Sequence, residues 1–321
     1  MSIKSLGNNN ITYTAVWEKT GTGAMSPPPS PIVAWGDRGV YGGGSLGSNY
    51  NIIDYITISS TGDATDFGDL TAARNGAAAM SSVDRGVWGG GNTGSASNIL
   101  DYITIATTGD ATDFGDLITA RQSCNSGTSS DVRGLIQGGW TGSNLNSIEY
   151  ITIATTGDAS DFGDLTQARH NAAGCGDGTY GLCAGGHSGG YVNTIDYVTI
   201  ATTGDSTDFG DLTNVKYALA GCPHETRGTF FGGYTDTPSG QYEDNIDYVT
   251  IATPGNATNF GDMTTAWGWL GACGNGTRAT KGGGEPNTNV IEYVTVDTTG
   301  NAADFGDLTQ TRWGVAGCSG D

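Results

Sequence analysis

Apolar residues recur along the chain in short runs separated by glycine-rich turns, and no segment shows the 3.6-residue period of an amphipathic helix. One unit illustrates the pattern, with small residues at 77–80, a run at 86–88 before a glycine pair, an apolar segment at 99–105 and an aromatic segment at 113–117. A Thr-Thr-Gly-Asp turn separates the last two segments, since glycine accepts positive φ and aspartate bonds to nearby backbone. The pattern predicts four short strands per unit.

An acidic residue followed by tyrosine marks six such units, at steps of 47, 48, 47, 51 and 45 residues. The acidic residues are Asp54, Asp101, Glu149, Asp196, Asp247 and Glu292. A Phe-Gly-Asp triplet begins 13 residues after each of them, and a glycine pair precedes each of them. A repeat of this length is typical of stacked or radial repeat architectures.

The third segment of each unit is apolar on both faces, which is typical of a strand buried between two layers. In a propeller each blade is covered by its neighbours, and the innermost strands converge where small residues fit. We therefore predict an all-β fold, a six-bladed β-propeller of four-stranded blades over residues 31–321. Residues 312–318 match a first strand and are expected to close the ring, removing an open edge. Residues 31–34 are the competing candidate for that position.

The order of arginine, small-residue strand, glycine pair, acidic-Tyr strand and Leu-Thr-x-x-Arg resembles the kelch repeat. Phe67 and its equivalents stand where kelch repeats usually carry tryptophan. The resemblance covers residues 31–321 and implies a kelch-like propeller, whereas kelch propellers serve many functions. The close similarity of the units and their richness in Thr-Gly-Asp also resemble propellers among tailed-phage virion proteins, which implies a structural or appendage protein.

Residues 1–30 precede the repeats and contain Pro27, Pro28 and Pro29, which favour a stiff, extended spacer. We expect this segment to be an arm that docks on other virion proteins. The alternative is a leader strand at residues 11–17 that folds back on the propeller, because this segment mimics the acidic-Tyr strand.

The chain carries a net charge of −20, from 33 acidic and 13 basic residues. Such a surface repels phosphate, and no cluster of lysine and arginine offsets the repulsion, so we expect neither nucleic acid nor an anionic membrane as partner. No apolar stretch is long enough to span a bilayer, and the N-terminus lacks the apolar core of a signal peptide. We expect no membrane insertion, and assembly into a virion in the host cytoplasm.

Residues suited to catalysis or metal binding are few. The three histidines, His170, His187 and His224, occupy different positions of the repeat and do not suggest one cluster. Four of the six cysteines share one repeat position, which Met80 holds in another unit. This exchange indicates apolar packing, so we expect free thiols. The sequence predicts no catalytic residue, metal or cofactor.

Aspartates repeat at Asp63, Asp66 and Asp69 and at the equivalent positions of later units, with asparagine at some of them. Hydrogen bonding at turns explains this spacing better than a Ca²⁺ site, although oxygen ligands suit Ca²⁺. We expect Asp69 and its equivalents to pair with the arginine five residues on, or with backbone amides.

Length varies in one loop of the repeat. The spacing from glycine pair to acidic residue runs 12, 12, 11, 11, 15 and 10 residues, so the variable loops are expected at one rim of the ring. Aromatic residues on loops over a rigid scaffold suit sugar stacking or protein contact, and the alternative is drift after duplication. The candidate binding residues are Tyr50, Trp140, His187, Tyr191, Tyr234, Tyr242 and Glu285.

These observations favour a non-enzymatic structural or interaction protein, namely a virion or tail-appendage component (a fibre or adaptor) that contacts other virion proteins and a host-surface glycan or protein. The alternative is a carbohydrate-binding, lectin-like propeller that uses the rim aromatics. A secreted hydrolase or oxidase is disfavoured because histidine is scarce and no acid pair converges outside the repeat.

Overall fold

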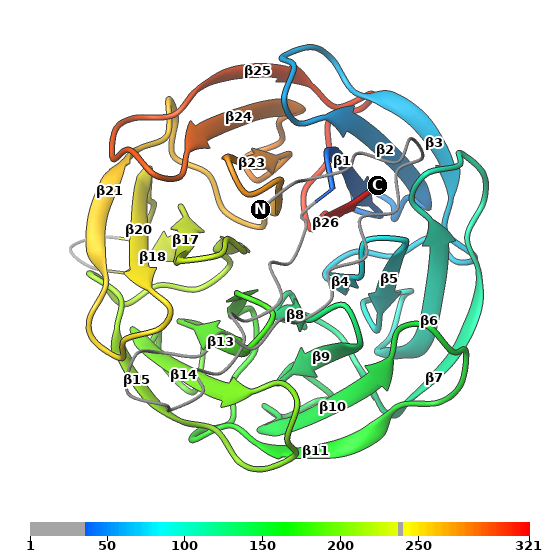
Figure 1. The fold of residues 1–321 in the computed structure, drawn as a ribbon, viewed down its shortest axis with the longest axis horizontal. Coiled ribbons are helices and arrows are strands. Elements are labelled where there is room, and N and C mark those ends of the chain that lie inside the picture. Colours follow the sequence, from blue (N-terminus) through cyan, green and yellow to red (C-terminus); the bar gives the residue numbers. More distant parts are fainter. Residues whose placement is uncertain (1–35, 237–239) are drawn as a thin grey trace, which may run out of the picture. The chain divides into compact units, whose positions relative to one another are not determined.

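The computed structural model describes residues 36–236 and 240–321, and the regular elements in that part of the chain are all β strands. Six four-stranded antiparallel sheets stand around a common axis, which confirms the predicted six-bladed propeller (Figure 1). The proposed arm at 1–30, the leader strand at 11–17 and the competing segment at 31–34 lie outside the described residues.

The blades are numbered in chain order, and their strands are given from the axis outward. Blade 1 holds β26 (Ala316–Gly320), β1 (Arg38–Gly42), β2 (Ile52–Thr57) and β3 (Thr65–Asp69). Blade 2 holds β4 (Ala78–Ser81), β5 (Arg85–Gly89), β6 (Ser97–Thr104) and β7 (Thr112–Arg121). Blade 3 holds β8 (Gly127–Ser129), β9 (Arg133–Gln137), β10 (Ser147–Thr152) and β11 (Ser160–Asp164).

Blade 4 holds β12 (Ala173–Gly176), β13 (Tyr180–Ala184), β14 (Thr194–Thr199) and β15 (Thr207–Asp211). Blade 5 holds β16 (Ala220–Cys222), β17 (Arg227–Phe231), β20 (Asn245–Thr250) and β21 (Thr258–Asp262). Its long loop forms a separate hairpin of β18 (Tyr234–Thr235) and β19 (Gln241–Tyr242). Blade 6 holds β22 (Gly271–Gly274), β23 (Arg278–Gly282), β24 (Val290–Thr295) and β25 (Ala303–Asp307).

The hydrophobic core lies between blades. One buried cluster joins Val40 and Ile53 of blade 1 to Trp88 and Ile103 of blade 2. Each blade therefore buries its apolar residues against its neighbours, as the two-sided pattern of the third segment predicted. A blade has no such core when it stands alone.

The C-terminal strand closes the ring, as the sequence predicted. β26 pairs antiparallel with β1, and Cys318 lies opposite Val40. The indole Nε1 of Trp88 in blade 2 donates to the carbonyl of Ala316 at 3.1 Å, and the backbone N–H of Asp321 donates to Val83 O at 2.8 Å. The last residues of the chain thus join the blade that begins the repeats to the blade that follows it.

Each Thr-Gly-Asp turn docks on the outer strand of the preceding blade. Gly109 donates its N–H to Phe67 O at 2.8 Å, and the Oδ1 of Asp110 accepts the N–H of Asp69 at 3.1 Å. Asn256 and Asn301 accept in the same way in later blades, because an asparagine Oδ1 serves equally well. The first position of the repeated aspartate spacing therefore serves a backbone hydrogen bond, which is made to the preceding blade.

A glycine in each outer strand makes room for this docking. Gly115 has a φ of 143°, and a Cβ there would lie 2.5 Å from the carbonyl oxygen of Gly157. Gly115→Ala is expected to lower the free energy of unfolding by roughly 2 kcal/mol or more, because it combines backbone strain with a clash. Urea denaturation measures the change. Gly300→Ala is the control, since a Cβ there meets no atom within 4 Å; equal unfolding midpoints for the two variants would contradict the docking role.

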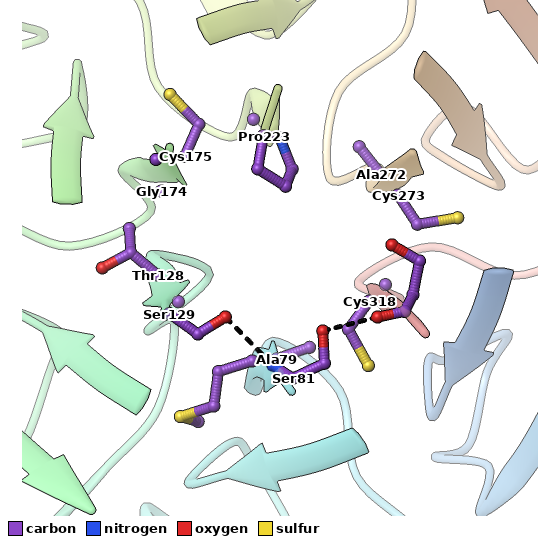
Figure 2. A pocket seen from close by; sticks show the side chains of 16 residues that line it. Ala79, Ser81, Thr128, Ser129, Gly174, Cys175, Pro223, Ala272, Cys273 and Cys318 are labelled. Atoms are coloured by element: carbon purple, nitrogen blue, oxygen red, sulfur yellow. Dashed lines mark hydrogen bonds between the residues drawn. The ribbon is translucent and has the colours of Figure 1, made fainter. Parts of the chain in front are cut away.

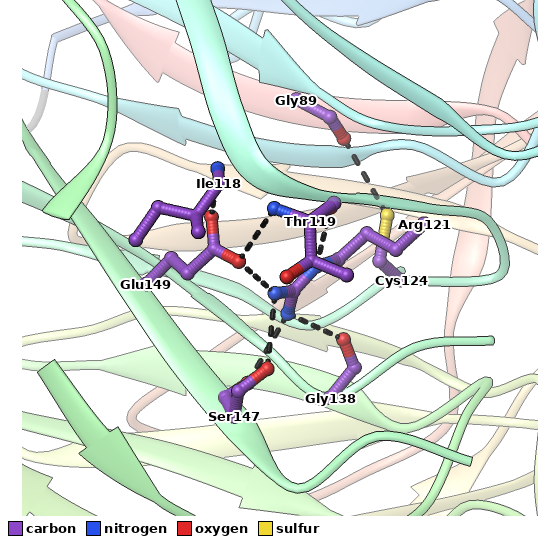
Figure 3. Close-up of polar contacts among 8 residues, drawn as sticks. All are labelled: Gly89, Ile118, Thr119, Arg121, Cys124, Gly138, Ser147 and Glu149. Carbon is purple, nitrogen blue, oxygen red and sulfur yellow. Dashed lines mark hydrogen bonds and ion pairs between the residues drawn. The ribbon is translucent and has the colours of Figure 1, made fainter. Parts of the chain in front are cut away.

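One buried ion pair lies in every blade, between the acidic residue of the third strand and a cation. The pairs are Arg312–Asp54, Arg74–Asp101, Arg121–Glu149, Arg169–Asp196, Lys216–Asp247 and Lys281–Glu292. In blade 3 the guanidinium of Arg121 also donates to the carbonyl of Gly138, and Glu149 accepts the N–H groups of Ile118 and Thr119 (Figure 3). In blades 1 to 5 the pair fastens the connection from the preceding blade to the third strand, whereas in blade 6 both partners lie within the blade.

The sequence interpretation of Asp69 as the partner of Arg74 is wrong. Arg74 Nη2 lies 2.8 Å from Asp101 Oδ2, and both side chains are fully buried, whereas Asp69 is exposed. The side chain of Arg74 turns inward because the buried carboxylate of Asp101, in the third strand of blade 2, attracts it. Burial raises the pKa of Asp101, and the charge of Arg74 opposes that rise.

Blade 6 keeps the ion pair although its arginine position holds Trp267. Lys281 of β23 supplies the cation instead, with Nζ 3.4 Å from Glu292 Oε2 and 5.8 Å from the centre of the Trp267 ring. Thr264 donates its backbone N–H to the same carboxylate at 3.1 Å. Blade 6 therefore keeps a cation beside the acidic residue of its third strand, although this cation comes from another position of the repeat.

The six cysteines are free and buried, as predicted. Cys175, Cys273 and Cys318 pack against a glycine in the second strand of the next blade; a Cβ on Gly228 would lie 2.5 Å from Cys175 Sγ. Met80 and Thr128 face Gly134 and Gly181 in the same way. Burial raises the pKa of the Cys273 thiol to about 11, so this thiol is protonated and unreactive at neutral pH.

Candidate functional site

Two connections of every blade meet on one face of the ring, here called the variable-loop face. They are the loop between the second and third strands and the connection from the outer strand to the next blade. The residue after the run of two or three glycines forms a backbone bridge with the residue after the cation position. The bridged pairs are Ser45–Trp313, Asn75–Asn92, Gln122–Trp140, His170–His187, Tyr217–Tyr234 and Gly268–Glu285. Their side chains are therefore neighbours on this face.

Nine ring side chains on this face form a continuous series, the aromatic arc, which runs from blade 3 through blades 4, 5 and 6 to blade 1. Its members are Trp140, His170, His187, Tyr191, Tyr217, Tyr234, Tyr242, Trp269 and Trp313. All nine are half-buried, so each keeps part of its ring surface exposed.

Tyr217 lies at the centre of the arc. Its ring stacks on Tyr191 with centroids 4.5 Å apart and an angle of 17°. It meets Tyr234 and Trp269 edge to face, at 5.8 and 5.3 Å. Burial raises the pKa of Tyr217, so its phenol stays protonated at neutral pH and remains a hydrogen-bond donor.

Trp269 has a strained backbone, with a φ of 51°. The equivalent positions of blades 2 and 1 hold Gly76 and Gly314, which adopt positive φ without penalty. The N–H of Trp269 donates to Ala218 O at 2.7 Å, and the N–H of Gly314 donates to Trp269 O at 2.8 Å. These bonds belong to a circle of backbone hydrogen bonds around the axis that imposes this conformation. Ser123, Asn171 and Ala218 hold positive φ at the same position of the repeat, so the conformation belongs to the ring and Trp269 is the bulkiest residue that adopts it.

The arc is bordered by amide side chains over blade 2. Asn75 Nδ2 donates to Asn49 Oδ1 at 2.6 Å, and Asn49 Nδ2 donates to the carbonyl of Asn92 at 2.7 Å. Gln122 lies beside Trp140 through their backbone bridge. The face is therefore divided into an aromatic part and an amide part.

Two histidines lie together in the arc, with ring centroids 5.1 Å apart. His170 Nδ1 lies 2.6 Å from Asn144 Oδ1 and so carries the proton of that hydrogen bond. Burial, together with the neighbouring charge of His187, lowers the pKa of His170 to about 4. His170 is therefore neutral at pH 7.

Because the pKa of His170 is depressed, the unfolded chain takes up its proton first as the pH falls. The stability linked to His170 is complete above about pH 6.5 and is lost between about pH 6.5 and 4. His170→Gln introduces the residue that stands at the equivalent position, Gln122, in blade 3. Its free energy of unfolding is expected to fall less than that of the wild type over this pH range. The difference is at most about 2 kcal/mol, because the ring of His170 is partly exposed. Thermal unfolding at pH 4.5, 5.5 and 7 measures the difference; parallel pH profiles for the two proteins would contradict it.

All eleven lysines and arginines in the described part of the chain have structural partners. Six form the buried ion pairs. The other five lie over tyrosine rings, at 4.4–4.9 Å from the centroid, and donate to backbone carbonyls of the following blade. These are Arg38, Arg85, Arg133, Arg227 and Arg278, which begin the second strands at the ends away from the variable-loop face. In residues 36–236 and 240–321, every lysine and arginine therefore already has a partner within the protein.

The propeller axis offers little room. Two small cavities lie on it. One, of about 40 Å³, is lined by residues such as Ser81, Ser129 and Cys273 (Figure 2). The other, of about 30 Å³, is lined by residues such as Ala77 and Asn125. Such volumes hold a few water molecules and no sugar ring. Among the described residues, no group of three histidine, cysteine or acidic side chains is placed to hold a metal ion. No helix in this part of the chain is long and apolar enough to cross a membrane.

Five of the seven candidate residues meet in the aromatic arc. They are Trp140, His187, Tyr191, Tyr234 and Tyr242. Glu285 lies next to the arc, and its charge adds to burial in raising the pKa of Tyr242. Tyr50 lies on the loop of blade 1, and no ring contact joins it to the arc among the described residues.

The candidate binding residues named from the sequence do not include four members of the arc, namely His170, Tyr217, Trp269 and Trp313. They lie in the connection into the innermost strand, whose length hardly varies. The signal was the residue directly after the cation position, which is Asn75 or Gln122 in two blades and aromatic or histidine in three. Comparison with protein-family models finds no match to this chain, and comparison with curated proteins finds none either.

Proposed function

We propose that this chain is a non-enzymatic binding protein and that the variable-loop face is its binding surface. The propeller fold suits an interaction protein in general. The observation that carries the proposal is the aromatic arc, because its rings are gathered on one face while the rest of each blade repeats the same scaffold. Half-exposed tyrosine and tryptophan are the side chains that dominate binding energies at interfaces.

In the finer form of the proposal, the chain is a component of a virion or tail appendage. Residues 1–30 attach it to other virion proteins, and the ring presents the variable-loop face outward. The resemblance of the repeats to tailed-phage propellers supports this form, and so does the acidic surface, which suits a protein that must not bind the packaged nucleic acid.

Deletion of residues 1–30 tests this attachment. The shortened chain is expected to keep the cooperative unfolding of the ring but to stop co-sedimenting with virion particles. The full-length chain with Tyr217→Ala is the matched variant, and it is expected to stay on the particle because the arc faces outward. A shortened chain that still sediments with particles would refute the arm.

A carbohydrate-binding function is the second candidate. The observation that favours it is the border of amide side chains, Asn49, Asn75 and Asn92, beside the aromatic arc. Rings that cover apolar sugar faces, together with amides that bond to hydroxyls, form the usual composition of a polar-ligand site. The two candidates are compatible, because an appendage can bind a host-surface glycan.

A further inference from the structure

We propose that the aromatic arc binds a neutral oligosaccharide, several sugar units long and without carboxylate, sulfate or phosphate groups. This inference rests on the proposed function and names the ligand class of the same surface. Three observations carry it: the charge of the ring, the extent of the arc, and the polar groups that border it.

The charge of the ring excludes anionic ligands. Eleven basic and 32 acidic residues lie in the described part of the chain, and each of the eleven cations is held by an ion pair or by a tyrosine ring and a carbonyl. An anionic sugar would find no free lysine or arginine to replace the water that it loses. It would also approach against the field of the uncompensated carboxylates.

The extent of the arc favours a chain of sugars over a single ring. Successive members lie 5.2 Å apart from Trp140 to His170, 5.1 Å from His170 to His187 and 6.3 Å from Trp269 to Trp313. The series crosses five blades, which is far longer than one pyranose. A single sugar would cover only a small part of it.

The polar groups along the arc suit hydroxyls. Asn144 accepts from His170 through Oδ1 and keeps its amide nitrogen as a donor. Gln122 lies beside Trp140, and the Tyr217 phenol is protonated at neutral pH. A cationic peptide is the competing ligand, since aromatic rings also attract cations. A carboxylate, Glu285, lies at the Tyr242 end of the arc, whereas the amides Gln122 and Asn144 lie beside Trp140 and His170 at the other end.

Trp269 offers a variant that separates binding from folding. Its equivalents Gly76 and Gly314 adopt the same positive φ, so Trp269→Gly keeps the backbone bonds and removes strain. We expect the variant to fold, because the relieved strain offsets part of the stability lost with the ring contacts of Trp269. We also expect the dissociation constant to rise about tenfold or more, as for loss of a central aromatic contact. Tyr217→Ala is expected to act alike. Val132→Ala, at an exposed residue between β8 and β9 and away from the variable-loop face, is expected to change binding less than twofold.

The test passes the full-length chain at pH 7 over immobilised dextran, mannan and galactan, with dextran sulfate as the anionic counterpart. We expect retention by at least one neutral polymer, elution by its own oligosaccharides, and no retention by dextran sulfate at physiological salt. Retention by none of the neutral polymers, or equal retention of the wild type and Trp269→Gly, would overturn the inference.

A second arm separates this inference from the proposed function. Host cell envelopes are treated with periodate, which destroys sugar diols, and are then tested for binding of the full-length chain. Binding that survives periodate but is lost in Trp269→Gly would overturn the saccharide and leave the binding face in place. Binding that is indifferent to Trp269→Gly and Tyr217→Ala would overturn both.

Discussion

A chain that ends at Gly314 is expected to lose its closed ring and to unfold or aggregate at 37 °C. Removal of β26 takes the innermost strand from blade 1, exposes the edge of β1 and uncovers Trp88 of blade 2. Stability of a domain is about 5–15 kcal/mol, and the loss of a core strand exceeds what such a margin tolerates. Circular dichroism and size-exclusion chromatography of the shortened chain measure the effect.

A synthetic peptide of residues 314–321 is expected to restore the ring in trans, because the exposed edge of β1 is a template for strand addition. A scrambled peptide is the control. A chain that lacks only Asp321 should fold, since it loses two terminal hydrogen bonds and no part of the strand register. If the chain that ends at Gly314 melts cooperatively at the wild-type temperature, β26 does not close the ring.

Lys281→Met is expected to lower the free energy of unfolding by about 3–5 kcal/mol, because it leaves the fully buried carboxylate of Glu292 without a cation. Burial lowers the pKa of Lys281, and the carboxylate of Glu292 opposes that shift. The charged form of Lys281 is therefore stabilised by Glu292. Denaturant unfolding at pH 7 measures the loss.

Trp267→Arg in the Lys281→Met background is expected to recover most of this loss. It restores the arrangement of blades 2, 3 and 4, in which an arginine at that position reaches the acidic residue of the third strand. The matched control is Trp267→Arg alone, which places two cations beside one carboxylate and should not stabilise. A double variant as unstable as Lys281→Met would show that the two positions are not interchangeable.

The repeat determined most of the fold because every blade depends on the same few residues. The acidic-Tyr pair, the glycine pair and the Phe-Gly-Asp triplet each correspond to one strand or one inter-blade contact, so six copies predict six blades. The exchange of Cys175 and its equivalents with Met80 likewise predicted free, buried thiols. The ring closure followed from the same logic, since residues after Arg312 repeat a first strand that would otherwise have no blade.

The partner of each arginine could not be read from sequence distance. Asp69 is five residues from Arg74, but Asp101, which is 27 residues away, lies next to it in space. The twist of the connection between blades turns the arginine inward, and this geometry is not encoded in a local pattern. Lys281 shows the same limit, since its replacement of the missing arginine is visible only when β23 and β24 are side by side.

Only part of the candidate site was predicted from the sequence, and the rest was missed for a related reason. Variable loop length drew attention to His187, Tyr191, Tyr234 and Tyr242, whereas His170 and Tyr217 lie in connections whose length is nearly constant. The backbone bridges bring the two connections together, so five arc residues come from the variable loops and four from the connections between blades. Loop variation alone therefore underestimates a surface that two kinds of connection share.

Hydroxyl-radical footprinting of the full-length chain, with and without the neutral polysaccharides, tests most directly whether the variable-loop face is where this protein binds. We expect reduced oxidation of Tyr191, Tyr217 and Trp269 when ligand is present, with no change at the exposed outer strand around Asp113. Protection of the outer strands, or unchanged oxidation of the arc in a sample shown to be bound, would contradict it.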